Sequence, residues 1–220
     1  MILIVAALAE EIRAFSDELK ETRLDRSFPF PVLSGSIEGF GNVSLGITGS
    51  GKVQASIHTA SLIARLDPDR VYGVGVAGAI EKSFSVGDLV QVKEAIQYDL
   101  NIGRFGLGRG MINGVLPTYV RASLSDDRFP AVRCGTADQF LTGKYVKKNP
   151  WIIEELELQI ADMESYCMLA AAEELHIPSI VYRVISDTIS GEKVKDFKSF
   201  MNTASRQLFD AVYEHVSHNS

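Results

Sequence analysis

The chain has 220 residues, 46% of which are hydrophobic, and a formal net charge of −6 at pH 7. This size and composition predict one globular domain over residues 1–220 that buries a single sizeable core. A negatively charged chain without a basic stripe is unsuited to nucleic acid, so we expect a small metabolite as the ligand. Apolar runs stay shorter than the roughly 18 residues of a membrane span, so no membrane partner is expected either.

Apolar runs typical of buried strands alternate with segments of helical composition along the chain. Strands are predicted over residues 2–8, 31–36, 43–48, 71–76, 88–96, 132–136, 158–161 and 179–185. Helices are predicted over 10–19, from residue 52 onward, over 163–175 and in the C-terminal segment. These units predict an α/β fold, a single-domain three-layer α/β/α sandwich with a mixed, largely parallel central sheet. Ligands of such sheets bind at the carboxyl ends of the strands.

The segment that starts at Lys52 has the periodicity of an amphipathic helix. Val53, Ile57, Ala60 and Ile63 recur at helical spacing and fall on one face. The segment is therefore predicted to form a helix with one apolar face.

The N-terminal segment and the cysteines predict a cytoplasmic protein. The apolar run over residues 2–8 has no basic segment before it and continues into Glu10 and Glu11, which is not the pattern of a signal peptide. Cys134 and Cys167 lack the spacing of metal ligands, so we expect them to fill the core of a protein in a reducing compartment. Neither a metal nor another cofactor is predicted.

Two glycine patterns resemble nucleotide-binding motifs. Residues 46–52 match a phosphate-binding loop, but Val53 replaces the Ser or Thr whose hydroxyl ligates magnesium. Residues 73–78 match the dinucleotide spacing, but residues 79–87 do not have the pattern of a helix that could bind a pyrophosphate. Both motifs therefore fail in their context, and what they indicate is backbone that can approach a ligand closely.

Acidic residues at buried positions are the most informative feature of the sequence. Glu164 begins an otherwise apolar helix, where an ionised side chain is costly unless a partner meets it. The alternative is helix capping, with Asp162 as N-cap and Glu164 in the first turn.

Asp187 directly follows a buried strand, although a turn or N-cap role is also open for it. Arg183 lies within that strand and requires a carboxylate partner, for which Glu11 at the end of the first strand is a candidate.

Taken in order, several short segments resemble the bacterial methylthioadenosine/S-adenosylhomocysteine nucleosidases of the nucleoside phosphorylase superfamily. The matching segments are residues 7–11, 49–53, 75–78, 86–88, 136–141, 162–164 and 183–187. The resemblance implies hydrolysis of the N-glycosidic bond of an adenine nucleoside, with release of adenine through an oxocarbenium-like transition state. It also implies a homodimer.

The resemblance assigns a role to each acidic residue. Asp187 would be the general acid for the departing base, held in place by Ser186. Glu164, next to Met163, would bind the ribose hydroxyls. In addition, Glu11 would position and deprotonate the attacking water.

Other matching positions imply the remainder of the pocket, including Arg183 as the polar neighbour of the water-activating carboxylate. Backbone groups near Phe140 and Leu141 would read the edge of adenine, with the Phe ring stacked on the base. The group at the 5′ position would meet Phe197. Two residues of a neighbouring subunit, Ile102 and Phe105, would complete that part of the pocket.

Two departures from the family pattern leave the 5′ substituent open. Ser50 replaces an apolar residue between two glycines, and Val76 replaces a serine, as in the futalosine hydrolases. A futalosine hydrolase, a phosphate-dependent nucleoside phosphorylase and a nucleoside-binding sensor without turnover are the alternatives. Glu11 favours hydrolysis over phosphorolysis because a carboxylate repels the phosphate dianion.

Overall fold

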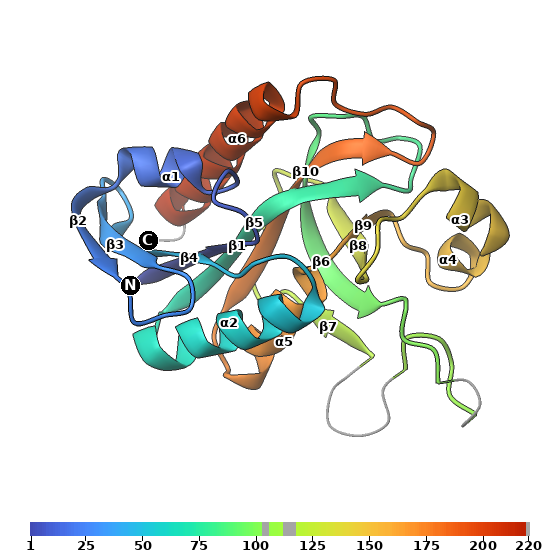
Figure 1. Ribbon diagram of the computed structural model, residues 1–220, viewed down its shortest axis with the longest axis horizontal. Helices are drawn as coiled ribbons and strands as arrows, with labels where there is room; N and C mark the ends of the chain where they lie inside the picture. The colour runs from blue at the N-terminus through green and yellow to red at the C-terminus, as the bar shows by residue number, and fades with distance from the viewer. Residues whose placement is uncertain (103–105, 112–117, 219–220) are drawn as a thin grey trace.

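The computed structural model describes residues 1–102, 106–111 and 118–218. A mixed 10-stranded sheet lies at its centre, with helices on both faces (Figure 1). The predicted α/β fold with a mixed central sheet is therefore confirmed.

Part of the sheet closes on itself. Its strands are β1 (Ile2–Ala6), β2 (Lys20–Asp25), β3 (Val32–Ile37), β4 (Gly41–Ile47), β5 (Arg70–Ala79), β6 (Leu89–Gln97), β7 (Tyr119–Arg121), β8 (Ala131–Thr136), β9 (Ile160–Asp162) and β10 (Ser179–Thr188). Their order is β10-β6-β8-β9-β5-β1-β4-β3-β2, with β7 paired to β6. Because β10 also pairs with β5, the strands β5, β9, β8, β6 and β10 form a ring. This ring contains antiparallel pairs beside parallel ones, so the sheet is more evenly mixed than expected.

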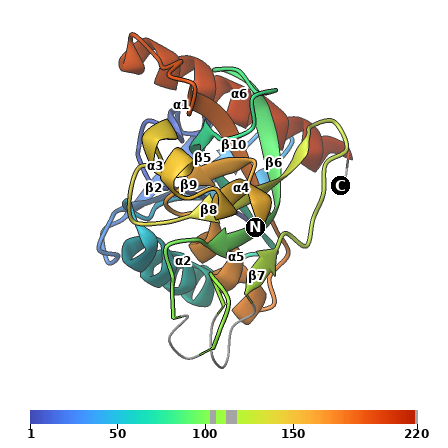
Figure 2. The same cartoon turned by 90° about the vertical axis from the view of Figure 1, so that its right-hand side faces the viewer.

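Two helices cover each face of the sheet (Figure 1, Figure 2). α2 (Lys52–Leu66) and α5 (Ser165–Glu174) pack over one apolar cluster, and α1 (Arg13–Glu18) and α6 (Phe197–His218) pack over another. At one end of the sheet, α3 (Gly143–Lys148) and α4 (Trp151–Glu154) cover a third cluster. No helix in the described part of the chain combines the length and apolarity of a membrane span.

Four elements were not predicted, and each lacks a sequence signal for a physical reason. The side chains of β2 are almost all exposed, so no apolar alternation marks it. The three-residue β7 and the short helices α3 and α4 are too brief for a period to appear. The helix expected over 10–19 is also shorter, because the residues after β1 form tight turns before α1 starts.

The apolar face predicted on α2 is buried only in part. Val53 and Ile57 are 64% and 59% exposed. Ile63 is buried and Ala60 packs against the same core cluster, and the buried stripe also contains His58 and Leu62. A histidine is tolerated there because its Nδ1 atom lies 2.5 Å from the backbone oxygen of Thr48. The predicted helix is confirmed, and its buried face is shifted because a hydrogen-bonded polar side chain can occupy a core position.

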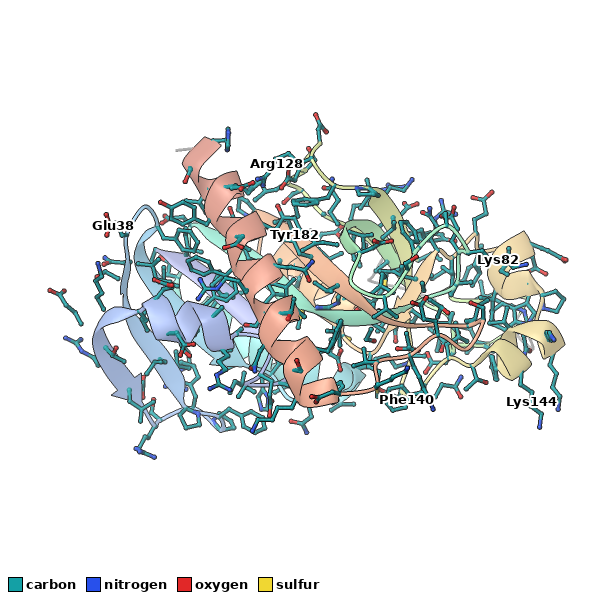
Figure 3. The ribbon with its side chains drawn as sticks, turned by 90° about the horizontal axis from the view of Figure 1, so that it is seen from above. Glu38, Lys82, Arg128, Phe140, Lys144 and Tyr182 are labelled. Carbon is teal, nitrogen blue, oxygen red and sulfur yellow. The ribbon has the colours of Figure 1, made fainter. Side chains whose placement is uncertain are left out.

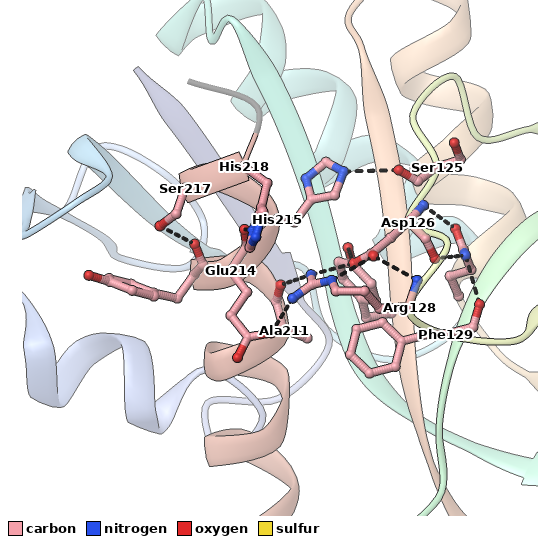
Figure 4. A network of polar contacts seen from close by, with 12 residues as sticks. Ser125, Asp126, Arg128, Phe129, Ala211, Glu214, His215, Ser217 and His218 are labelled. Atoms are coloured by element: carbon pink, nitrogen blue, oxygen red, sulfur yellow. Dashed lines mark hydrogen bonds and ion pairs between the residues drawn. The ribbon is translucent and has the colours of Figure 1, made fainter.

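A buried polar network fixes α6 against the sheet (Figure 4). His215 of α6 lies 2.9 Å from the Tyr72 hydroxyl of β5. Arg128 forms an ion pair with Asp126 and donates to a backbone oxygen of α6. The Tyr182 hydroxyl of β10 donates to the same Asp126 carboxylate at 2.7 Å. These contacts hold the helix in one orientation, which places its first residue beside the cavity described next.

Candidate active site

A cavity of about 560 Å³ opens where β1, β5, β9 and β10 end. Most residues predicted for the site line it: Glu11, Ser50, Val76, Phe140, Leu141, Met163, Glu164, Ser186, Asp187 and Phe197. Arg183 is buried and contacts the cavity wall through Asp162. Ile102 does not line this cavity and Phe105 lies outside the described residues, so their place in a neighbouring subunit's pocket stays a prediction.

Asp187 reaches the cavity because of a bulge in β10. The register against β5 pairs Ile185 with Ala77 and Asp187 with Gly78, which leaves Ser186 as the extra residue. A bulge re-aims the side chains beside it. The Ser186 hydroxyl donates to Asp187 Oδ1 at 2.7 Å. A Cβ atom at Gly78 would lie only 3.2 Å from Asp187 Oδ2, so glycine leaves room around the second oxygen.

Glu11 lies in the turn after β1 and is buried. Its carboxylate accepts hydrogen bonds from the backbone N–H groups of Leu8 at 2.9 Å and Val76 at 3.1 Å. Burial raises the pKa of Glu11, while the charge of Arg183 and the N–H donors act in the opposite direction. A carboxyl group with a raised proton affinity in a cavity wall has the property that a general base requires.

Arg183 pairs with Asp162, and the two atoms Arg183 Nε and Asp162 Oδ2 are 2.8 Å apart. The prediction of a carboxylate partner is confirmed, but that partner is Asp162 and not Glu11. Burial opposes the charge of Arg183, yet Asp162, Glu11 and Glu164 together raise its pKa. The one positive charge of Arg183 therefore lies among three carboxyl groups and favours the ionised form of each.

Asp162 lies two residues before the N-cap position of α5, and its side chain also binds the start of that helix. Its carboxylate accepts hydrogen bonds from the backbone N–H groups of Glu164 and Ser165 and from the Thr136 hydroxyl. Although burial opposes its charge, Arg183 and the neighbouring hydroxyl groups hold the pKa of Asp162 below its usual value. The sequence did not indicate that Asp162 pairs with Arg183, because an Asp before a helix has the same local sequence pattern with or without a distant arginine.

Glu164 is the N-cap residue of α5, but its side chain makes no capping hydrogen bond. Its Oε1 atom instead accepts the backbone N–H of Gly51 at 2.9 Å. Burial and the negative charge of Asp162 raise the pKa of Glu164 to about 7, against the opposing effects of Arg183 and Gly51. The capping interpretation is therefore wrong for the Glu164 side chain, which lines the cavity.

Replacing Glu164 by Gln is expected to stabilise the fold, and more at high pH than at low pH. The pKa of Glu164 is about 7 in the folded protein and 4.5 as the ordinary value, so its burial costs stability that grows as the pH rises from about 4.5 to 7 and is fully present above pH 7. Glu164→Gln removes that cost and keeps an oxygen for the Gly51 N–H group. We expect a gain on the order of 2 kcal/mol in the free energy of unfolding near pH 8, shrinking towards pH 5. Urea unfolding at both pH values measures it.

Glu174→Gln is the matched control, because Glu174 is exposed on the same helix. It is expected to change stability equally at both pH values. A pH-independent gain for Glu164→Gln would contradict the assignment of a costly buried charge.

One side of the cavity comes from a segment that the sequence did not single out. The segment between β10 and α6 contributes Gly191, Glu192, Lys193 and Val194 to the wall. Loop residues carry no periodicity, so no pattern could have placed them at the site.

The two glycine patterns lie next to the cavity, but neither has the geometry of the nucleotide-binding motif that it resembles. The pattern over 46–52 does join β4 to α2, but the Gly51 N–H group points at the Glu164 carboxylate, which would repel a phosphate. The second pattern continues as strand to Ala79, and a turn then leads to β6. Over the described residues, no group of three or more His, Cys, Asp or Glu is arranged to hold a metal ion.

Fold and cavity together define an α/β protein with a small-molecule site at the carboxyl edge of its sheet. The chain belongs to the phosphorylase superfamily, whose family profile matches residues 1–217.

Relatives and solved structures extend this assignment over nearly the whole chain. A 5′-methylthioadenosine/S-adenosylhomocysteine nucleosidase from Geobacillus sp. is 27% identical, over 98% of this chain and 97% of that protein. A nucleosidase of the same name from Bacillus velezensis is 27% identical, over 91% of each. The structure of a Campylobacter jejuni nucleosidase superposes with a TM-score of 0.88 at 21% identity, covering 99% of this chain and 98% of that one. A Streptococcus pneumoniae nucleosidase with a transition-state inhibitor superposes with a TM-score of 0.84 at 24% identity, covering 100% and 99%.

Proposed function

We propose that this protein hydrolyses the N-glycosidic bond of an adenine nucleoside, 5′-methylthioadenosine or S-adenosylhomocysteine, and releases adenine. The observation that carries the proposal is the convergence of Glu11, Glu164 and Asp187 on one cavity. The names of the relatives that match over nearly the full length support an adenine nucleoside as the substrate.

Asp187 protonates the departing base. Cleavage of an N-glycosidic bond passes through an oxocarbenium-like sugar, and the leaving adenine gathers negative charge that a proton neutralises. The hydrogen bond from Ser186 occupies Asp187 Oδ1. The other oxygen therefore carries the proton towards N7 of adenine.

Glu164 and Glu11 act on the sugar. Glu164 accepts hydrogen bonds from the ribose hydroxyls, and its negative charge supports the cationic sugar. Glu11 accepts a proton from a water molecule, whose oxygen bonds to the anomeric carbon as the bond to adenine breaks. From behind the cavity wall, the positive charge of Arg183 favours the ionised form of both carboxyl groups. A carboxylate at the position of attack favours water over phosphate as the nucleophile.

Phe140 supports the adenine base by stacking. The side chain is 87% exposed and projects from the loop before α3, so it has no packing role in the free protein (Figure 3). Phe140→Ala is expected to raise KM about tenfold with little change in kcat, because stacking on a base is worth roughly 1–3 kcal/mol. Steady-state kinetics measures this split, and Phe140→Tyr, which keeps the ring, should resemble the wild type. A wild-type KM for Phe140→Ala would remove the residue from the adenine site.

We further propose a cytoplasmic homodimer, with one nucleoside phosphorylase-like domain of residues 1–220 in each subunit. Val53 and Ile57 stand exposed one turn apart on α2, which supports contact with a second copy. Ile102 and Phe105 of the partner subunit would then complete the 5′ end of the pocket. Light scattering on the purified protein should give twice the mass of the chain, and a monomer would contradict the proposal.

A panel of nucleosides tests the proposed function. We expect adenine release from 5′-methylthioadenosine and S-adenosylhomocysteine, at rates that do not depend on phosphate. Release from futalosine alone would assign the protein to the futalosine hydrolases. Binding without release from any nucleoside would indicate a sensor.

A further inference from the structure

Lys52 joins three segments that surround the cavity. It is the first residue of α2 and follows the glycine-rich turn. Its Nζ atom lies 2.6 Å from Asp99 Oδ1, just beyond β6, and 4.0 Å from Asp138 Oδ2 in the loop after β8. Its backbone N–H donates to Asp138 Oδ1 at 2.7 Å, and the Asp138 N–H donates to Asp99 Oδ2 at 3.2 Å. The lysine of the apparent phosphate loop is therefore held by two carboxylates.

These contacts continue directly into the cavity wall. Gly51, the residue before Lys52, donates its N–H to Glu164 Oε1 at 2.9 Å. The φ angle of Gly51 is +88°, and a Cβ atom there would lie 3.0 Å from Asp138 Oδ1. Asp138 itself precedes the wall segment that contains Phe140. The position of Lys52 thus sets both the donor to Glu164 and the start of the adenine loop.

We infer that Lys52 is a positioning residue for the nucleoside site: by binding Asp99 and Asp138 it holds the Gly51 N–H group against Glu164. The inference rests on the proposed function. The Lys52 and Asp99 side chains are only 17% and 22% exposed, so this ion pair is screened less than a surface pair. Without the lysine, two neighbouring carboxylates would repel each other and move the segments that carry them.

Removal of Lys52 is expected to change the pKa of Glu164, which the loss of a lysine that only stabilises the fold would not do. The groups that act on Glu164 are Asp162 and Glu11, which raise its pKa, and Arg183 and the Gly51 N–H group, which lower it. A displaced Gly51 no longer donates, so the pKa of Glu164 rises further. Because ribose binding requires ionised Glu164, the acidic limb of the kcat/KM profile should move to higher pH.

Lys52→Met tests the inference. We expect KM to rise about tenfold at neutral pH, the effect of losing one hydrogen bond to a charged group, and the acidic limb to shift upward. Lys144→Met is the matched control, since Lys144 is exposed on α3, and it should leave KM and the pH profile unchanged (Figure 3). Lys52→Arg keeps the charge and is expected to restore most of the lost affinity.

Asp99→Asn attacks the same ion pair from the other side and covers the case in which Lys52→Met does not fold. It should shift the acidic limb in the same direction, but less, because Asp138 still contacts Lys52. Unchanged KM and pH profiles in both variants would overturn the inference while leaving the proposed function intact. A wild-type protein that releases no adenine would instead overturn the proposed function itself.

Discussion

Asp187→Asn is expected to lower kcat by about a hundred- to ten-thousandfold, the range of a lost general acid, while the protein stays folded. Asparagine has nearly the same shape and can still accept the Ser186 hydroxyl at its amide oxygen. It cannot give an acidic proton to the departing adenine. KM should change little, because the substrate loses no contact area. Adenine release and the thermal unfolding midpoint are the two measurements.

Asp127→Asn provides the control for Asp187→Asn, because Asp127 is exposed and far along the chain from the cavity wall. A sharper comparison uses a riboside whose leaving group departs without protonation, such as 4-nitrophenol. The variant should lose much less activity on that compound than on an adenine nucleoside. Equal losses on both would show that Asp187 acts in some way other than as the acid.

Glu11→Gln is the second change with a large expected effect, again a loss in kcat of about a hundred- to ten-thousandfold. An amide cannot accept the proton of the attacking water. Because both carboxylate oxygens of Glu11 accept backbone N–H groups, from Leu8 and Val76, the amide nitrogen of glutamine faces a donor. A small loss of stability should therefore accompany the loss of turnover.

Glu10→Gln separates the role of Glu11 from a general effect of charge at this turn. Glu10 precedes Glu11 and is exposed, so its replacement should leave kcat and the unfolding midpoint unchanged. Calorimetry should show that Glu11→Gln still binds the nucleoside. Turnover by Glu11→Gln within a few-fold of the wild type would remove Glu11 from the reaction.

The strands that position the site were predictable because they are buried on both faces. Every residue of β1 is buried, as are the first seven residues of β10, and such strands appear as continuous apolar runs. The solvent-facing strand β2 carries no such run. The apolar face predicted on α2 is buried only in part, because Val53 and Ile57 face outward while His58 faces inward beside Ile63. The spacing of apolar residues alone does not show which of them are buried in the core and which are exposed on the surface.

In the candidate site, too, single residues could be predicted from their own segment of sequence, whereas contacts between distant segments could not. Glu164 and Asp187, which both line the cavity, were singled out because an acidic residue next to a buried segment is costly without a partner. The true partner of Arg183 could not be found, since Glu11 and Asp162 are both carboxylates at strand ends and only the packed sheet brings one of them to the guanidinium. The bulge at Ser186 was equally hidden, because an extra residue in a strand appears only in its register against the neighbour.

The central claim is that water, activated by Glu11, replaces adenine on the sugar. Incubating the protein with 5′-methylthioadenosine in phosphate-free buffer made with oxygen-18 water tests this claim most directly. We predict one adenine for each substrate molecule consumed and one labelled oxygen on the anomeric carbon of the released sugar. No adenine without phosphate, or a sugar phosphate as the product when phosphate is present, would contradict it.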